Sequence, residues 1–144
     1  MSPTIKALLS TRAGFGVSLL RVLIGFIFMA HGAQKLFGWF GGYGLEGTGQ
    51  WMESIGLAPG YLMAVLSGSA EFFGGLAVLL GLLARPAALV LSATLVVAIF
   101  TVHISNGLFM ANNGYEFALA LMAGTLAILL EGAGRVSLDR LIAR

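Results

Sequence analysis

The sequence predicts an all-α integral membrane protein, an antiparallel four-helix bundle with a glycine- and aromatic-rich interfacial first loop. Composition is the first observation: 58% of the 144 residues are hydrophobic and 10% are charged, whereas soluble domains carry roughly 25% charged residues. The second is a mean hydropathy of +0.96. The third is the gathering of apolar residues into long runs, which a bilayer accepts directly.

Four runs have the character of membrane spans, at about residues 14–37, 61–83, 87–105 and 115–130. A helix needs roughly 20 apolar residues to cross the hydrocarbon region of a bilayer. Pro86 suits the first position of the third helix, and the Asn and Gly residues between the third and fourth runs favour a turn. We therefore expect residues 1–144 to form a single transmembrane domain of antiparallel helices.

The first connection is longer than the others and holds both tryptophans of the chain. Its aromatic residues are Trp39, Phe40, Tyr43 and Trp51. Such side chains favour the membrane–water boundary, and we expect one short interfacial helix over residues 50–55, stopped by Gly56 and Pro59. The segment would be a surface anchor, a lid over an opening between the helices, or both.

The distribution of charge predicts the orientation in the membrane. The basic residues near the spans' ends are Lys6, Arg12, Arg85, Arg135, Arg140 and Arg144. The first two precede the first span, Arg85 lies in the second connection, and the last three follow the fourth span. The first connection instead carries Glu46 and Glu53. The positive-inside rule then places both termini in the cytoplasm. The first run is longer than the apolar part of a signal peptide, so we expect it to remain as a span.

Two classes of function are excluded by composition. A net charge of only +2, without a basic patch interleaved with aromatics, argues against nucleic acid as a partner. The chain has no cysteine, which excludes disulfides, thiolate metal sites and CxxC redox chemistry. If the protein serves a redox pathway, electrons must pass through a bound cofactor or a partner protein.

Ionisable side chains within spans are candidate functional residues, because each costs about 2.5 to 3.5 kcal/mol at the bilayer centre on insertion scales. In or near the spans they are Arg21, His31, Lys35, Glu71, His103 and Glu116. Helical phase puts Arg21 and Lys35 on one face of the first helix. We expect Arg21 to meet Glu71 at mid-depth as a structural ion pair that sets the register of two helices, although a catalytic role stays open.

A second group of polar residues is expected toward the outer end. His31, His103 and Glu116 belong to three different helices and reach one level, and Lys35 and Asn106 could close the top. Together they predict a ligand-binding pocket. Each also has a structural interpretation: Lys35 could extend to the surface, Glu116 could favour a helix N-terminus, and either histidine could fill a buried hydrogen bond. No residue is assigned a catalytic role.

Three kinds of ligand are compatible with the residues of this pocket. A quinone head group suits it, because His or Lys can donate hydrogen bonds to its carbonyls and His and Glu can exchange its protons. A b-type haem held by His31 and His103 is the less favoured cofactor. Two histidines and a carboxylate could also ligate a metal, but no motif supports this, and no metal site is assigned.

Three segments of the chain resemble the DoxX family of small bacterial membrane proteins. They are "LLRVLIGFIFMAHGAQKLFGWFGG", "SGSAEFFGGLAVLLGLLARPAA" and "HISNGLFMANNGYEFALALMAG". The resemblance runs from about residue 14 to 140 and implies a four-helix fold. Some members form a membrane subunit of thiosulfate:quinone oxidoreductase, others are linked to catechol or quinone detoxification, and one acts in an oxidative-stress complex. The family has no agreed catalytic motif, so the resemblance transfers no catalytic residue.

The leading hypothesis is a DoxX-like protein of the bacterial cytoplasmic (inner) membrane. It would bind a quinone or similar small molecule in an outer-side polar pocket and support a redox or oxidative-stress pathway. One alternative is a non-enzymatic membrane subunit or scaffold for a redox partner protein. Another is a small permease or exporter, which would need to form a homo-oligomer. Whether the protein is an enzyme is left open.

Overall fold

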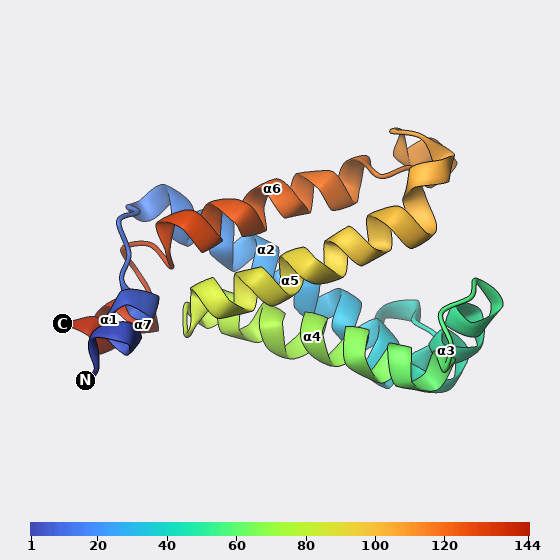
Figure 1. Ribbon diagram of the computed structural model, residues 1–144, viewed down its shortest axis with the longest axis horizontal. Helices are drawn as coiled ribbons and strands as arrows, with labels where there is room; N and C mark the ends of the chain where they lie inside the picture. Colours follow the sequence, from blue (N-terminus) through green and yellow to red (C-terminus); the bar gives the residue numbers. More distant parts are fainter.

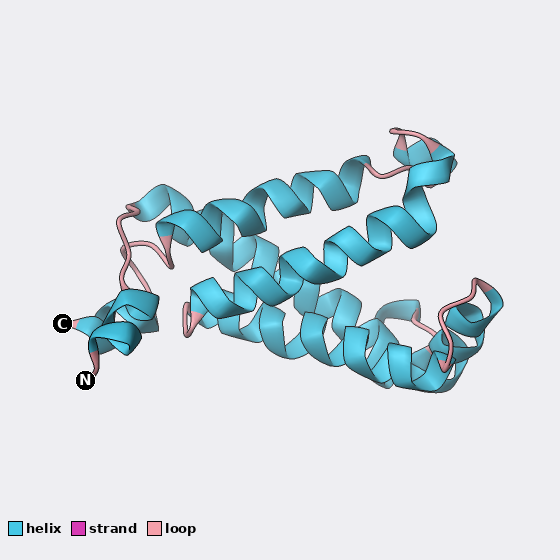
Figure 2. Ribbon diagram, in the orientation of Figure 1, coloured by secondary structure: helices cyan, strands magenta, loops and turns pink.

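The computed structural model describes residues 1–144, and the chain is entirely helical (Figures 1 and 2). The α-helices are α1 Pro3–Leu9, α2 Phe15–Phe37, α3 Gly44–Ser54, α4 Gly60–Leu80, α5 Ala84–Ala98, α6 Glu116–Glu131 and α7 Leu138–Ala143. The shorter segments are the 3-10 turns Trp39–Gly41, Ile104–Asn106 and Met110–Asn112 and the π-helix Ile99–His103. The predicted all-α class is confirmed, and α1 and α7 are helices that the hydropathy pattern did not predict.

Three helical stretches are long and apolar enough to cross a membrane: α2, α4 and the stretch Ala84–Asn106 that begins with α5. They correspond to the predicted spans 14–37, 61–83 and 87–105. The third starts three residues early, because Pro86 takes the third position of α5 and not the first. Helix α6 has 16 residues, which is about 24 Å of helix. Its role as a fourth span therefore stays a prediction.

Large apolar side chains cover the outside of these helices. Phe26 of α2 is 64% exposed, Phe100 of the π-helix 67% and Leu130 of α6 71%. Soluble monomers rarely expose so much contiguous apolar surface, whereas a bilayer offers these side chains an apolar solvent. The exposed faces are therefore the lipid-contacting faces of a membrane protein.

Helices α2 and α4 approach one another closely through glycine. A Cβ atom on Gly25 would lie 2.6 Å from the backbone nitrogen of Leu79, and a Cβ on Gly32 would come closer still to the backbone of Phe72. Lipid supplies no hydrophobic drive for helix association, so such close packing depends on small residues. The two contacts fix the register of α2 against α4.

The apolar core lies where α2, α4, α5 and α6 meet. Val78 of α4, Leu91 of α5 and Ile128 of α6 are fully buried there. A buried hydrogen bond of 2.8 Å joins the hydroxyls of Ser92 on α5 and Thr125 on α6. This contact satisfies both polar groups inside the core and ties α5 to α6.

The inward face of α6 differs from the pattern of small residues in its sequence. A stripe of Glu116, Ala120, Ala123 and Ala127 predicts a close helix contact, but Ala120 and Ala123 are exposed. The buried residues are Ala118, Leu121, Gly124, Thr125 and Ile128. The prediction is wrong because leucine and isoleucine fill the space between α5 and α6, while alanine is equally acceptable to lipid.

The first connection contains a longer interfacial helix than expected. Helix α3 spans Gly44–Ser54, so it starts six residues before the predicted segment 50–55. It lies against the start of α4, where the carboxylate of Glu53 accepts a hydrogen bond of 2.7 Å from the backbone N–H of Gly60. Because that N–H has no partner within α4, Glu53 caps the helix. Trp39, Phe40 and Tyr43 of this connection remain exposed.

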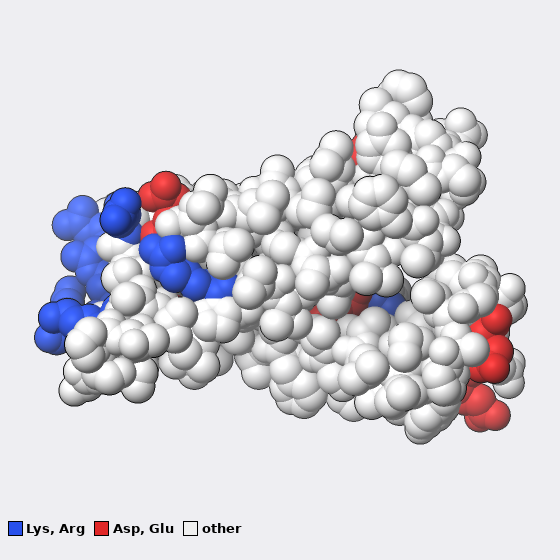
Figure 3. Space-filling model, viewed as in Figure 1, with Lys and Arg blue, Asp and Glu red and all other residues white.

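The two ends of the molecule differ in charge. Both termini, with α1 and α7, lie at one end, and α3 lies at the other (Figure 1). Basic side chains gather at the end with the termini, and acidic side chains are most prominent at the end with α3 (Figure 3). We call these the basic end and the α3 end.

Candidate functional site

The α3 end contains a cleft between helices α3, α4 and α5. Figure 3 shows a notch there, with basic and acidic side chains at its base. Its volume is about 230 Å³. Its polar lining residues are Lys35, Ser67, Glu71, Thr94, Thr101 and His103, and its apolar lining residues are Trp51, Met52, Leu57, Met63, Val97, Ala98 and Val102. A mostly apolar cavity with a few convergent polar groups is the usual form of a small-molecule site. We therefore define this cavity, the outer cleft, as the candidate site.

Lys35 of α2 and Glu71 of α4 form an ion pair in the outer cleft. The Lys35 Nζ and Glu71 Oε2 atoms are 2.5 Å apart, with 23% and 14% of the two side chains exposed. The stem of Lys35 fits against α4 because Gly68 leaves room for it: a Cβ there would lie 3.1 Å from the Lys35 Cβ. The site thus holds a largely desolvated pair of opposite charges, and it is the single salt bridge of the chain.

The predicted ion pair between Arg21 and Glu71 does not form. The glycine contacts that set the α2–α4 register place Phe72 opposite Gly32, so the neighbouring Glu71 lies level with the following turn of α2, where Lys35 is. Arg21 precedes Lys35 by 14 residues, which is roughly 21 Å along a helix. Sharing one helix face with Lys35 was therefore not enough to bring Arg21 to Glu71.

Arg21 lies near the basic end, where its side chain is 3% exposed. Its guanidinium donates from Nε to Ala133 O at 2.8 Å, from Nη1 to Val78 O at 2.8 Å and to Leu79 O, and from Nη2 to Val136 O at 2.5 Å. These carbonyls belong to the end of α4 and to the connection between α6 and α7. Arg21 is thus a structural crosslink between backbone segments.

His103 lies at the end of the π-helix and lines the outer cleft. Its Nδ1 is 2.9 Å from the carbonyl oxygen of Asn113. Because a carbonyl can only accept, Nδ1 carries the hydrogen, so in the neutral form of the ring Nε2 is an acceptor. π-Helical turns inside α-helices occur often at functional sites, and this one ends on the only histidine of the cleft.

The other predicted ligand residues lie outside the outer cleft. His31 is exposed on α2, with its ring centroid 6.1 Å from that of Phe117 on α6. Asn106 donates from Nδ2 to the carbonyls of Val102 and Asn113, each at 3.2 Å. Glu116 accepts a hydrogen bond of 3.1 Å from the backbone N–H of Met110. Asn106 and Glu116 therefore stabilise the third connection through hydrogen bonds to its backbone.

This arrangement bears on the cofactors considered for the site. A haem with two axial histidines needs both rings to face one space, but the outer cleft contains His103 and lacks His31. No three histidine, aspartate or glutamate side chains converge closely enough to hold a metal ion. A small organic molecule that accepts hydrogen bonds from Lys35 fits the lining residues better.

Two threonines of the outer cleft are not among the candidate residues of the sequence analysis. Thr94 and Thr101 are seven residues apart, two helical turns, and both line the outer cleft from the third span. Their spacing on an otherwise apolar helix is a signal that could have found them. Hydroxyls in a span are easily passed over, because each can bond to a carbonyl of its own helix: Thr94 donates to Leu91 O at 2.7 Å.

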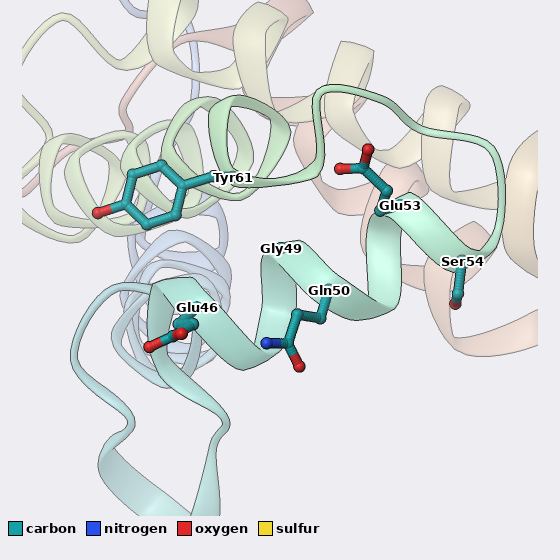
Figure 4. Close-up of a pocket in the computed structure, with 6 residues that line it drawn as sticks. All are labelled: Glu46, Gly49, Gln50, Glu53, Ser54 and Tyr61. Carbon is teal, nitrogen blue, oxygen red and sulfur yellow. The ribbon is translucent and has the colours of Figure 1, made fainter.

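A wider cavity, of about 460 Å³, lies on the outside of α3 and the start of α4. It is lined by Glu46, Gly49, Gln50, Glu53, Ser54 and Tyr61 (Figure 4). In Figure 4 the side chains of Gln50 and Ser54 point away from the ring of Tyr61, and Glu53 is engaged with Gly60. Polar groups that diverge cannot act on one ligand, so this surface is the weaker candidate.

Known proteins place the chain in a family. An all-helical chain with three apolar spans and a polar cleft among lipid-facing helices is a membrane protein. The family model described as DoxX matches residues 16–104, and the chain belongs to the DoxX family. The resemblance noted in its sequence segments is confirmed.

Several relatives match over most of their length. "Putative oxidoreductase CatD" of Bacillus subtilis is 37% identical over 86% of this chain and 84% of its own. Inner membrane protein YqjF of Escherichia coli is 32% identical over 88% of this chain and 92% of its own. Membrane protein Rv3486 of Mycobacterium tuberculosis is 31% identical over 99% of this chain and 91% of its own. No solved structure is significantly similar to the chain.

Proposed function

We propose that the outer cleft binds the head group of a quinone or a similar small dicarbonyl molecule, and that the protein supports a redox or oxidative-stress pathway of the bacterial membrane. The observation that carries this proposal is the Lys35–Glu71 ion pair, which shares one small apolar cavity with His103. Asn106, Glu116 and His31 are not part of the proposed site.

The chemistry of the lining residues suits such a molecule. The ammonium of Lys35 can donate to a quinone carbonyl, and the free Nε2 of His103 can accept the proton of a hydroquinone hydroxyl. Trp51 with Met52 and Met63 offers flat and polarisable apolar walls for a ring. A volume of about 230 Å³ is below the 300 to 1,000 Å³ typical of drug-sized ligands, which favours a single-ring head group with its tail in the lipid.

The ion pair also makes the outer cleft compatible with a neutral ligand. With Glu71 bonded to Lys35 at 2.5 Å, the cleft is neutral overall and can accept a neutral quinone. One relative, from Bacillus subtilis, is named as an oxidoreductase, which agrees with redox chemistry at this site.

We propose the same topology for the protein in its membrane as the charge pattern predicts. The basic end, which carries both termini, would face the cytoplasm by the positive-inside rule. Helix α6 would complete the bundle as a short fourth span, and the outer cleft would open toward the outer leaflet. The relative from Escherichia coli is named an inner membrane protein, and we propose that membrane for this chain as well.

Tryptophan fluorescence offers a direct test. The chain has two tryptophans, and Trp51 lines the outer cleft, so a Trp39→Phe background reports on the cleft alone. Titration with a short-tailed quinone in lipid nanodiscs should quench Trp51 saturably. His103→Ala should weaken this binding about tenfold or more, because it removes a polar partner and opens the cavity.

His31→Ala is the matched control, since that histidine lies outside the outer cleft. It should leave the binding curve unchanged. Quenching that never saturates, or that is the same in His103→Ala and the parent, would count against the proposed site.

The exposed aromatics of the first connection favour one second candidate. Trp39, Phe40 and Tyr43 are 56%, 69% and 81% exposed, and aromatic residues are enriched in protein interfaces. The protein would then be a membrane subunit that docks a redox partner through this surface. Copurification of a stoichiometric partner that Phe40→Ser releases, with no quinone binding, would favour this function.

A further inference from the structure

A larger cavity, separate from the outer cleft, lies at the basic end. It has a volume of about 470 Å³ and is bounded by α2, the end of α4, and residues 135–144. Its cationic lining residues are Arg21, Arg135, Arg140 and Arg144. The rest of its wall is largely apolar, with Val22, Leu80 and Leu141 among the side chains. We call it the arginine cavity.

No arginine of the arginine cavity forms a salt bridge with a carboxylate. Asp139 lies close enough to interact with the charge of Arg21, but both of its oxygens accept hydrogen bonds from backbone N–H groups. The single salt bridge of the chain is Lys35–Glu71, at the opposite end. Arg135 lies over the ring of Phe15, with its Cζ atom 5.1 Å from the ring centroid, a contact that leaves its positive charge uncompensated. Besides Arg21, the arginines Arg135, Arg140 and Arg144 line one cavity without a salt-bridge partner, and together they create a positive potential there.

Arg21 gives the cavity a fixed positive floor. Its side chain is 3% exposed, and its four hydrogen bonds to carbonyls hold the guanidinium in place without neutralising its charge. An anion in the cavity would therefore be attracted by the fixed charge of Arg21, while its hydrogen bonds would come from Arg135, Arg140 and Arg144. This is a built feature of the fold, since Arg21 belongs to the buried face of α2.

The apolar part of the wall faces lipid. Val22 is 41% exposed, Leu80 43% and Leu141 61%. They belong to α2, α4 and α7, which meet the arginines at the end of the spans. A ligand that satisfies both surfaces must carry an anionic phosphate next to an apolar chain. Juxtamembrane basic pockets of this kind suit anionic lipid headgroups.

We propose that the arginine cavity binds one anionic phospholipid. The headgroup phosphate contacts Arg135, Arg140 and Arg144, and an acyl chain lies along Val22 and Leu80. The proposal is independent of the outer cleft and of its ligand. The occupant is a lipid and not free phosphate, because apolar side chains line the cavity together with the arginines.

The test is a binding titration of the full-length protein in a neutral detergent, followed by native mass spectrometry. The probes are a short-chain phosphatidylglycerol, the matching phosphatidylcholine and inorganic phosphate. The parent protein should hold one phosphatidylglycerol at least about tenfold more tightly than phosphatidylcholine, because each arginine near an anionic headgroup contributes about 1 kcal/mol. Inorganic phosphate at the same concentration should not displace it.

Two double variants, each of which removes two positive charges, distinguish a defined lipid site from a general attraction of anionic lipid to the basic end. Arg135→Gln with Arg140→Gln should abolish the preference for phosphatidylglycerol. Lys6→Gln with Arg12→Gln should keep it, because those residues line a neighbouring cavity and not this one. Should the first pair fail to fold, Arg144→Gln, at the last residue, should still weaken the preference about threefold.

Three results would overturn the proposal. Equal loss in both double variants would mean that the basic end attracts anions without a defined site. Displacement by inorganic phosphate would mean a phosphate site without a role for the acyl chain. Equal affinity of the parent for both lipids would mean that the cavity does not select charge.

Discussion

The two ends of the molecule treat buried polar groups in different ways. At the basic end, side chains bind the backbone: Arg21 donates to four carbonyls, and both carboxylate oxygens of Asp139 accept backbone N–H bonds at the start of α5, from Leu83 at 2.7 Å and Ala84 at 2.9 Å. At the α3 end, Lys35 and Glu71 bind each other beside a cavity. The contacts at the basic end link backbone segments to one another, whereas the ion pair at the α3 end borders a cavity that a ligand could enter.

This difference separates structural from functional polarity. A side chain whose donors all end on backbone carbonyls has nothing left to offer a ligand, and its removal leaves those acceptors buried without partners. Arg85 belongs to the same class, since it donates to Leu129 O at 2.5 Å and Leu130 O at 2.7 Å at the end of α6. An ion pair on a cavity can exchange one partner for a ligand. Stability should therefore depend on the contacts of Arg21 and Arg85 at the basic end, and quinone binding on the ion pair at the α3 end.

Arg21→Met should have the largest effect on stability. It leaves four carbonyls without a donor, and we expect a loss of about 3 kcal/mol or more in the free energy of unfolding. Arg21→Lys should recover part of that loss, because an ammonium keeps up to three donors. Reversible unfolding in mixed micelles measures both.

Arg12→Met is the matched control for charge at the same end. Arg12 is exposed, and its loss should change stability by no more than about 0.5 kcal/mol. If Arg12→Met and Arg21→Met destabilise equally, the carbonyl contacts of Arg21 do not carry the stability that we assign to them.

Asp139 should have an intermediate effect that depends on pH. The residue is 1% exposed, and burial raises the pKa of its carboxyl above the usual 3.8, against the opposing effect of the N–H groups of Ala84 and Leu83 and of the charges on Arg21 and Arg85. A carboxyl with a raised folded-state pKa binds its proton more tightly when folded. The stability that it contributes is therefore full below about pH 4 and declines as the pH rises through the raised pKa.

Asp139→Asn should remove this pH dependence. The amide has one acceptor oxygen in place of two, so we expect a loss of roughly 1 to 2 kcal/mol at acid pH. That deficit should shrink as the pH rises toward 7, because the parent loses its contribution while the variant does not. Melting temperatures of both proteins from pH 3 to 7 measure the trend; a deficit that grows with pH would mean that the folded-state pKa is lowered.

Much of the fold could be predicted from the sequence, because apolar run length reports directly on membrane spans. The limits appear where packing decides. Arg21 and Glu71 were expected to meet, but the depth of each depends on the α2–α4 register, which Gly25 and Gly32 set through backbone contacts. Helices α1 and α7 are too short and polar to stand out in hydropathy, and their positions depend on contacts at the basic end.

The candidate site could be predicted in part. Lys35 and His103 are predicted at the outer end, and both line the outer cleft. They could be found because an ionisable residue stands out within an apolar span. The partner of Lys35 was not foreseen, and neither were the roles of Asn106 and Glu116 in holding the third connection. Level along the membrane normal could be estimated for Lys35 and His103 but not for Arg21 and Glu71, and the outward direction of His31 could not be predicted.

The most direct test replaces the ion pair of the outer cleft as a whole. In Lys35→Met with Glu71→Met, two side chains of similar volume fill the place of the pair, and such replacements are often neutral or stabilising. Lys35→Met alone is the control that leaves Glu71 unpaired, and it should cost about 3 kcal/mol or more.

For the double variant, unfolding free energy and quinone binding should be measured on the same preparation. If the ion pair serves binding, stability should stay within about 1 kcal/mol of the parent or rise, while saturable quinone binding is lost. A loss of about 3 kcal/mol with quinone affinity unchanged would contradict the central claim, because the pair would then be structural like the contacts of Arg21.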